Sequence, residues 1–332
     1  MNDAVIVSGA RTPVGRFGGA FKDVGAPDLG SIAIKAAIER SGISPDMVDE
    51  VVLGNAIQAA EAGYAARLAS LKAGIPHDTP TIAVNRQCSS GLEAINMAAQ
   101  LVRTGEADIV VAGGTENMSQ VPYFIEYKAR FDGLRMGNSQ LVDGLTEGLG
   151  CPVNRYHMGV TAENVAERFS VSREDQDELA VISHQRASTA ISQGRFTNQI
   201  TTVSVPQRKG DPITVMEDEG PRADTTIEGL SNLRPVFKKD GTVTAGNASS
   251  INDGSAAVVM MSAQKAADLG IKPKMKWRTR GIAGVEPAVM GIGPVPAVQK
   301  AMDKSGMTVN DFDVIELNEA FASQALYVIR KG

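Results

Sequence analysis

The residue with the clearest chemical potential is Cys88, which lies in the run TIAVNRQCSSGLEAINMAAQLV from Thr81 to Val102. The short, β-branched and apolar start, Thr81 to Asn85, predicts a buried strand. From Leu92 onward, apolar residues recur at the spacing of one helix face. Cys88 therefore falls in a strand-to-helix turn, where backbone amides and the positive helix end favour the thiolate, the nucleophilic form of cysteine.

The residues that follow Cys88 have the types expected at a helix start. Ser89 or Ser90 is suited to the N-cap, and Gly91 would let the backbone turn tightly into the helix. The expected buried face of this helix holds Leu92, Ile95, Ala99 and Val102. The alternative is a buried structural cysteine, because a free cysteine packs like a small hydrophobic residue. The local pattern leaves both interpretations open.

Other side chains that bind metals or form disulfides are few. The two cysteines, Cys88 and Cys151, form no disulfide framework and suit a reducing compartment, so we expect a cytoplasmic protein. The three histidines lack ligand spacing, and we expect no metal site. They are His77, His157 and His184. We find no signal-peptide pattern and no apolar run of about 18 residues, and therefore expect no membrane association.

The composition indicates a globular chain of ordinary type. Its 332 residues suit one large or two medium domains, and 43% are hydrophobic. The net charge of −5 argues against nucleic acid as the main partner. Alternating Lys and Arg from Lys272 to Arg280 predict a strand with one solvated basic face, which we favour over a phosphate site.

Strands alternate with helices in the first part of the chain, which predicts a parallel sheet covered on both faces. Strands are expected at Ala4 to Val7, Val51 to Leu53, Ile109 to Ala112 and Ala256 to Met261. A helix with Leu29 and Ala33 on its apolar face should end at Gly42, and a second helix should cover Ala65 to Lys72. From Glu116 to Thr244 the pattern changes to loops and short helices, with one polar helix from Ser172 to Gln193.

The sequence contains an internal repeat. Ala33 to Ala56 aligns without gaps to Ala297 to Ala320, with identical residues at positions such as Gly42 and Gly306. The fold class is therefore α/β with two similar βαβ-type halves. We expect three domains: 1–115 plus 245–268 as an N-terminal half, 116–244 as an inserted loop domain, and 269–332 as a partial C-terminal half. The second half is incomplete, because the counterpart of Cys88 would fall beyond Gly332.

The residues resemble the thiolase family over essentially the whole chain. The matching segments, in family order, are SGARTPVGRFGG at Ser8 to Gly19, NRQCSSGL at Asn85 to Leu92, GGTENMS at Gly113 to Ser119, HMGVTAENVAERF at His157 to Phe169, GTVTAGNASSINDG at Gly241 to Gly254, GIGPVPA at Gly291 to Ala297 and NEAFA at Asn318 to Ala322. The doubled halves with an inserted loop domain are also what a thiolase would have.

The resemblance implies acyl transfer in fatty acid metabolism, with two molecules of acetyl-CoA condensed to acetoacetyl-CoA and CoA, or the reverse thiolysis. Cys88 would carry the acyl group, a role that suits a thiolate because it both attacks and leaves a thioester readily. The Cys88 N–H and a water held by Asn318 would stabilise the oxyanion. From its position, Asn318 could also cap a helix from Glu319 to Ala325.

The resemblance also implies substrate contacts and partners. His157 and Met158 would lie near the acyl group, Ser249 near the pantetheine arm, and Arg222 near the adenine nucleotide. Acyl-CoA and CoA are then substrates, and no other cofactor is expected. A homo-oligomer, either a dimer or a tetramer, is implied as well.

Two family segments have no match in this sequence: GHP, whose histidine activates the nucleophile, and CxG, whose cysteine acts as acid and base. We therefore expect the chain to be C-terminally short and nearly inactive alone. His157 favours the four-carbon substrate, whereas NRQCSSGL resembles degradative 3-ketoacyl-CoA thiolases of broader chain length. A ketoacyl-carrier-protein synthase and a non-catalytic CoA-binding chain remain alternatives, although NEAFA and HMG disfavour the synthase.

Overall fold

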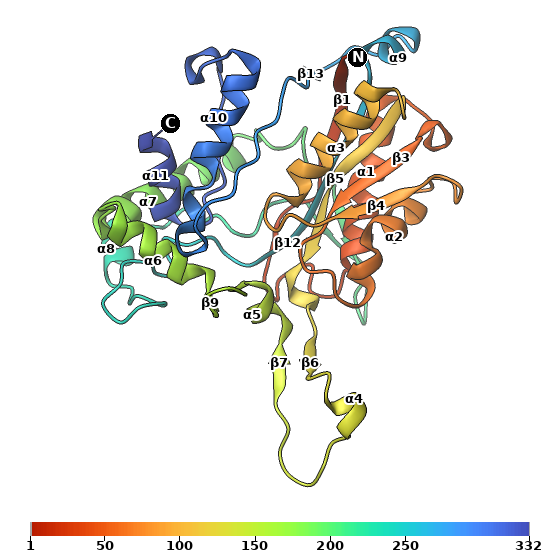
Figure 1. Cartoon of the computed structure of the whole chain (residues 1–332). Coiled ribbons are helices and arrows are strands. Elements are labelled where there is room, and N and C mark those ends of the chain that lie inside the picture. The colour runs from red at the N-terminus through yellow and green to blue at the C-terminus, as the bar shows by residue number, and fades with distance from the viewer. Residues whose placement is uncertain (1, 332) are drawn as a thin grey trace. The chain divides into compact units, whose positions relative to one another are not determined.

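The computed structural model describes residues 2–331, which divide into two compact units (Figure 1). Unit 1 comprises Met1–Gly148, Phe196–Gly220 and Ile251–Trp277, and unit 2 comprises Leu149–Arg195, Pro221–Ser250 and Arg278–Gly332. Within the described residues, no helix is both long enough and apolar enough to cross a membrane. The three-domain division expected from the repeat stays a prediction.

Unit 1 is built on a seven-stranded sheet in the order β13-β1-β12-β5-β3-β4, with β2 paired to β12. The strands are β1 (Ala4–Arg11), β2 (Gly15–Arg16), β3 (Glu50–Gly54), β4 (Thr81–Val84), β5 (Ile109–Asn117), β12 (Asn252–Ser262) and β13 (Met275–Lys276). β3 runs parallel to β4 and β5, but β12 runs antiparallel to both β1 and β5.

The expectation of a parallel sheet is therefore only partly right, since the sheet is mixed. The reason lies in the excursion between β5 and β12. β12 begins beside the residue at which β5 ends, because Asp253 pairs with Asn117. A chain that leaves and re-enters a sheet at the same end must return antiparallel.

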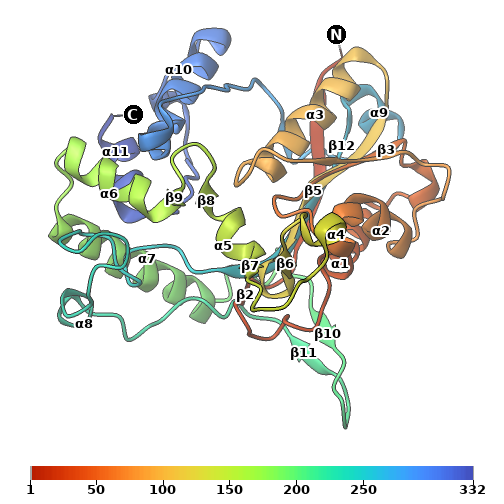
Figure 2. The ribbon, with the colours of Figure 1, turned by 60° about the horizontal axis from the view of Figure 1, so that its bottom comes forward.

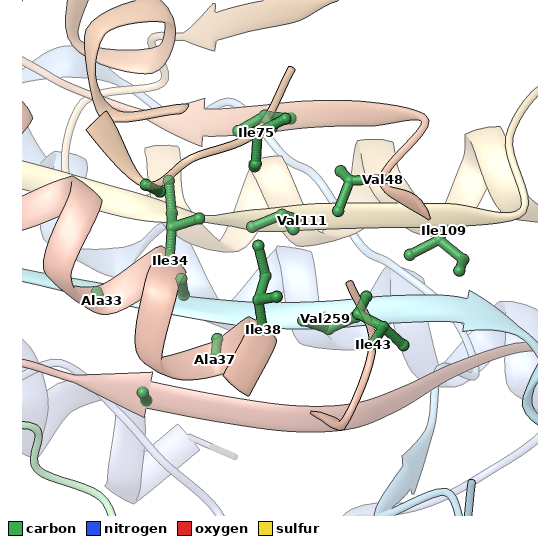
Figure 3. Close-up of a cluster of buried hydrophobic side chains, with 14 of the residues drawn as sticks. Ala33, Ile34, Ala37, Ile38, Ile43, Val48, Ile75, Ile109, Val111 and Val259 are labelled. Carbon is green, nitrogen blue, oxygen red and sulfur yellow. The ribbon is translucent and has the colours of Figure 1, made fainter. Parts of the chain in front are cut away.

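Helices cover both faces of this sheet. On one face lie α1 (Ala26–Ser41) and α2 (Ala65–Lys72), and Figure 3 shows Ile34 and Ile38 of α1 directed toward Val111 and Val259 of the strands. On the other face lies α3 (Ser90–Thr104), which packs against Val52 among others. Alternate strand residues thus face opposite layers, which buries the sheet on both sides.

Several expected elements are confirmed, but β4 is less buried than expected, and the expected buried face of α3 is right at Ala99 and Val102 and wrong at Leu92. α1 ends at Gly42 in the left-handed conformation, with φ 77°, and α2 has the expected bounds. β4 is only partly buried because it is the edge strand. On α3, Leu92 is 64% exposed, and the buried face comprises Ala94, Ala98, Ala99 and Val102 together with the polar residues Ser90, Glu93 and Asn96.

Smaller elements of unit 1 lie outside the sheet. They are η1 (Pro45–Met47), η2 (Ala60–Tyr64), η3 (Met118–Gln120), β6 (Tyr123–Ile125), α4 (Ala129–Asp132), β7 (Leu141–Asp143), α5 (Gly144–Gly148), β10 (Val203–Val205), β11 (Ile213–Val215) and α9 (Ala263–Asp268). β6 and β7 form one antiparallel hairpin and β10 and β11 another, both visible in Figure 2. The expected basic strand is shorter than predicted, since only β13 pairs with β1.

Unit 2 is mainly helical. It contains β8 (Gly150–Cys151), β9 (Tyr156–His157), α6 (Met158–Arg168), α7 (Arg173–Ser192), α8 (Ile227–Ser231), η4 (Pro287–Ile292), α10 (Pro294–Ser305), η5 (Val309–Asp311) and α11 (Ala322–Lys331). The predicted polar helix is confirmed as α7, whose cap is the Ser172 side chain, which accepts a hydrogen bond from Asp175 N. α11 packs on α6, where the buried Ser323 Oγ donates to Ala162 O at 3.0 Å.

The repeat predicts structure correctly in its helix but not in its strand. α10 is the counterpart of residues 30–41 of α1 and ends before Gly306, which has the same left-handed conformation as Gly42, with φ 68°. The counterpart of β3, residues 314–318, is not a strand in the described chain. β3 is held by ladders to β4 and β5 on its two sides. An extended segment without hydrogen-bonded neighbours on either side does not form a strand of a sheet.

Candidate active site

Cys88 lies in the turn between β4 and α3, as expected, and is exposed. The alternative of a buried structural cysteine is therefore wrong. The preceding residue, Gln87, has φ 49°, a strained left-handed conformation for a residue with a side chain. Three hydrogen bonds hold this conformation: Gln87 N donates to Asn85 Oδ1 at 3.0 Å, and Ser90 donates to Gln87 O through its N at 2.9 Å and its Oγ at 2.5 Å.

The two serines are placed as predicted but bond differently. Ser89 is the N-cap residue of α3, yet its side chain makes no capping hydrogen bond and instead donates to Arg86 O at 2.9 Å. Ser90 Oγ accepts from Arg86 N at 2.8 Å. Both side chains therefore close the turn that carries Cys88 instead of capping the helix.

Glycines bring the start of α3 directly onto the sheet. A Cβ on Gly54, at the end of β3, would lie 2.4 Å from the carbonyl carbon of Ser90. A Cβ on Gly114 of β5 would lie 3.3 Å from Gly91 Cα. Gly91 itself does not have a positive φ, so its expected role in a tight turn is wrong. The close approach of helix and sheet instead depends on Gly54 and Gly114, because a Cβ on Gly91 would lie 3.8 Å from its nearest neighbours on β5.

A half-buried carboxylate, Glu116, lies at the carboxyl end of β5. Glu116 accepts hydrogen bonds from Ala56 N at 2.8 Å, Ile57 N at 3.4 Å and Asn55 Nδ2 at 2.9 Å. Burial raises the pKa of Glu116 above its ordinary value, although these bonds oppose the shift. Sequence reasoning gave Glu116 no role, even though it lies in the GGTENMS segment immediately after a strand.

In unit 2, His157 is the N-cap residue of α6, and its Nδ1 accepts from Gly159 N at 3.0 Å. Its ring stacks on Phe237, with centroids 4.7 Å apart and planes 12° from parallel. Burial lowers the pKa of His157. The side chain is therefore neutral at pH 7, with the proton on Nε2. Met158 follows it as the first residue of α6 and donates its N–H to Leu149 O at 2.9 Å.

The segment that holds Asn318 is joined to the Ser249 loop by backbone hydrogen bonds. Ser249 N donates to Ala320 O and Ala322 N donates to Asn247 O, both at 2.9 Å. Asn318 is exposed, and α11 begins only at Ala322. The expected helix start at Glu319, with Asn318 as its cap, is therefore wrong.

Aromatic contacts connect this segment with His157. Phe321 meets Phe237 edge to face, with centroids 6.2 Å apart, and Phe237 is the ring that stacks on His157. Three predicted sites of unit 2, at His157, Ser249 and Asn318, thus belong to neighbouring segments. Cys88 belongs to unit 1.

Arg222 is exposed, and its backbone N donates to His184 Nδ1 at 3.1 Å. Burial lowers the pKa of His184, the positive charge of Arg222 lowers it further, and Glu319 and Asp224 oppose the shift. The expected contact of Arg222 with a nucleotide stays a prediction. Among residues 2–331, no three His, Cys, Asp or Glu side chains are grouped so that they could hold a metal ion.

Comparison with known proteins identifies the family. The thiolase N-terminal domain family matches residues 4–264, and the thiolase C-terminal domain family matches residues 271–331. A probable acetyl-CoA acyltransferase of Staphylococcus aureus is 50% identical over 332 residues, which are 100% of this chain and 84% of that protein.

Solved structures agree with the sequence relatives. The acetyl-CoA acetyltransferase of Bacillus anthracis has a TM-score of 0.96 at 42% identity, covering 99% of this chain and 83% of that one. Human mitochondrial 3-ketoacyl-CoA thiolase in complex with CoA has a TM-score of 0.94 at 41% identity, covering 99% and 82%. The motifs expected from the sequence, the mixed α/β fold and these matches agree, and the chain belongs to the thiolase family.

Proposed function

We propose that this thiolase-type acetyl-CoA acyltransferase condenses two molecules of acetyl-CoA to acetoacetyl-CoA and CoA, or catalyses the reverse thiolysis, with Cys88 as the acyl carrier. The observation that supports Cys88 most directly is its exposed position in a strained strand-to-helix turn. An exposed thiol beside a helix N-terminus is open to a thioester and lies where negative charge is stabilised.

The transfer has two steps. In the first, Cys88 Sγ attacks the carbonyl carbon of acetyl-CoA, the C–S bond to CoA breaks, and CoA leaves with a proton. In the second, the α-carbon of another acetyl-CoA loses a proton and attacks the acetyl group on Sγ. A C–C bond forms, and the Cys88 thiolate is released. By resemblance, the Cys88 N–H and a water held by Asn318 stabilise the oxyanion.

The four-carbon product is favoured by His157. Its ring is neutral and fixed against Phe237, so it occupies space beside α6 as a rigid and largely apolar wall. A 3-ketoacyl-CoA thiolase of broader chain length is the second candidate, supported by the NRQCSSGL segment. A relative named human mitochondrial 3-ketoacyl-CoA thiolase, 41% identical to this chain, also supports this candidate.

CoA recognition is proposed for unit 2, with Met158 near the acyl group, Ser249 near the pantetheine arm and Arg222 near the adenine nucleotide. The human relative is described in complex with CoA, which supports CoA thioesters as substrates. We propose no further cofactor. A homo-oligomer, dimer or tetramer, and a cytoplasmic location remain part of the proposal, and both cysteines being free thiols is consistent with that compartment.

The 332 residues contain no counterpart of the GHP histidine or the CxG cysteine. Loss of general acid–base catalysis costs about 10² to 10⁴ in rate. A preparation of these 332 residues is therefore expected to turn over slowly. In that case Cys88 would still be acetylated, or the chain would still bind CoA. The chain alone would then correspond to the non-catalytic CoA-binding candidate.

The test combines turnover with detection of the intermediate. Thiolysis of acetoacetyl-CoA and of a 3-ketodecanoyl-CoA by the purified chain is followed at matched concentrations, with Cys88→Ser as the control. Incubation with acetyl-CoA and mass spectrometry then locate any acetyl group. Acetylation at Cys88 and a preference for acetoacetyl-CoA are expected. Acetylation or turnover that persists in Cys88→Ser would refute the assignment, and faster thiolysis of the longer substrate would favour the second candidate.

A further inference from the structure

We propose that Glu116 is a positioning residue for the nucleophile: it fixes the turn that carries Cys88 through the loop after β3 and through Asn85. This inference rests on the proposed function only in taking Cys88 as the nucleophile. Glu116 does not itself touch Cys88. All the groups involved belong to unit 1.

The hydrogen bonds form a continuous path from Glu116 to the turn. Glu116 Oε2 accepts from Ala56 N at 2.8 Å, and Ala56 O accepts from Asn85 Nδ2 at 2.8 Å. Asn85 Oδ1 accepts from Gln87 N at 3.0 Å. Gln87 is the residue directly before Cys88, so the path ends at the peptide group next to the nucleophile.

The end of this path lies at a strained residue. Gln87 has φ 49°, and such a conformation persists only where its surroundings fix it. Asn85 fixes Gln87 from the N–H side, and Ser90 fixes it from the carbonyl side, with Oγ at 2.5 Å and N at 2.9 Å from Gln87 O. Release of Asn85 would remove one of the two restraints, and the turn would relax away from its present relation to α3.

A carboxylate is needed at the start of the path because three donors converge there. Ala56 N, Ile57 N and Asn55 Nδ2 all point at Glu116, and Asn55 Nδ2 also donates to Thr115 O at 2.9 Å. A carboxylate can accept from all three, whereas an amide offers one oxygen and turns an NH₂ group toward another donor. Glu116→Gln therefore loses at least one of these bonds with almost no change in side-chain size.

A second carboxylate of unit 1, that of the buried Asp253, provides a control. Asp253 accepts from Ser119 N at 3.0 Å and Ser119 Oγ at 2.5 Å, and burial raises its pKa as it does that of Glu116. No hydrogen bond of Asp253 that the structure records leads to the loop after β3. Asp253→Asn thus removes a similar charge from the interior of unit 1 without interrupting the path.

The experiment measures the rate of Cys88 alkylation by iodoacetamide at pH 7 in the folded chain, with no acyl-CoA present. Loss of one hydrogen bond of about 1 kcal/mol corresponds to about a fivefold change in rate. We expect Glu116→Gln and Asn85→Ala each to slow alkylation about fivefold, and the double variant to be no slower than the slower single. Asp253→Asn should stay within about twofold of the wild type.

The pH and the double variant separate positioning from a general structural effect. At pH 9.5, where an ordinary cysteine thiol is ionised, the variants should react at the wild-type rate, whereas blocked access would slow them there too. Multiplying effects in the double variant, or an unchanged rate in Asn85→Ala, would overturn the proposal. Asn85 is exposed, so its variant remains informative even if Glu116→Gln does not fold. Failed acetyl transfer with these alkylation results intact would count against the function and not against the positioning role.

Discussion

The contact between Gly54 and the start of α3 gives the most specific prediction. A Cβ on Gly54 would lie 2.4 Å from Ser90 C, 2.5 Å from Gly91 N and 2.7 Å from Ser90 O. All three are backbone atoms, so no side chain can rotate away. Ordinary contact begins near 3.4 Å. Gly54→Ala must therefore move α3 and β3 apart by about 1 Å. The surrounding interior is packed at the density of an organic crystal and leaves little room for this movement.

Overpacking of this kind typically costs 1–3 kcal/mol, and we expect the upper end, about 3 kcal/mol, because the obstacle is backbone. The matched control is Gly91→Ala. Outside its chain neighbours and its own helix turn, its Cβ would come no closer than 3.8 Å to another atom, and its φ is not positive. Alanine at this helical position should leave the free energy of unfolding unchanged or raise it by about 0.5 kcal/mol.

The assay is urea unfolding, followed by the fluorescence of Trp277, the single tryptophan. Trp277 Nε1 donates to Asn96 Oδ1 on α3 at 3.0 Å, so its emission reports on the helix that Gly54→Ala displaces. Equal free energies of unfolding for Gly54→Ala and the wild type would refute the argument. A Gly91→Ala variant as unstable as Gly54→Ala would refute it too, since the effect would then not depend on the measured approach.

The remaining predictions concern a histidine, the two thiols and a buried amide. Because burial lowers the pKa of His157 in the folded state, the stability that this histidine contributes is present above its unfolded-state pKa and is lost as the pH falls below that value. Between pH 7 and 5 the free energy of unfolding should therefore fall less in His157→Asn than in the wild type. An equal fall in both proteins would contradict this prediction. Iodoacetamide should label the exposed Cys88 in the folded chain and spare Cys151, which is 5% exposed, until urea is added, as peptide mass spectrometry would check. Asn247→Ala should lower the free energy of unfolding by about 2 kcal/mol, measured in urea, because it leaves the buried Asp177 Oδ1 without a donor at 2.9 Å; a loss within 0.5 kcal/mol would contradict this estimate.

Local sequence patterns predicted the position of Cys88 well but not the packing of the helix behind it. A short β-branched strand, two serines and a glycine before an apolar helix define a turn by local chemistry alone. Which face of α3 is buried depends on the partner. Small residues such as Ala94 and Ala98 face the sheet because the glycine contacts bring the helix too close for Leu92. Periodicity of large apolar residues cannot reveal such a close approach.

Direction and pairing of strands were less accessible to sequence reasoning for a related reason. Each strand of the sheet is recognisable alone, but the antiparallel return of β12 depends on where the excursion from Met118 to Ile251 begins and ends in space. The segment 314–318 aligns with β3 in the repeat, with Leu317 at the position of Leu53, yet a strand also requires neighbours. Glu116 was missed because it accepts hydrogen bonds from groups distant in sequence, two backbone amides and the side chain of Asn55.

The same contacts that stabilise unit 1 also determine the geometry around Cys88. Gly54 ends β3 against Ser90, and the next three residues supply the donors that converge on Glu116. The loop after β3 is therefore held both by its contact with α3 and by the half-buried carboxylate of Glu116. Displacement of either restraint should be felt at Gln87, where the strained conformation depends on both. Gly54→Ala should thus slow Cys88 alkylation as Glu116→Gln does, although one changes shape and the other charge.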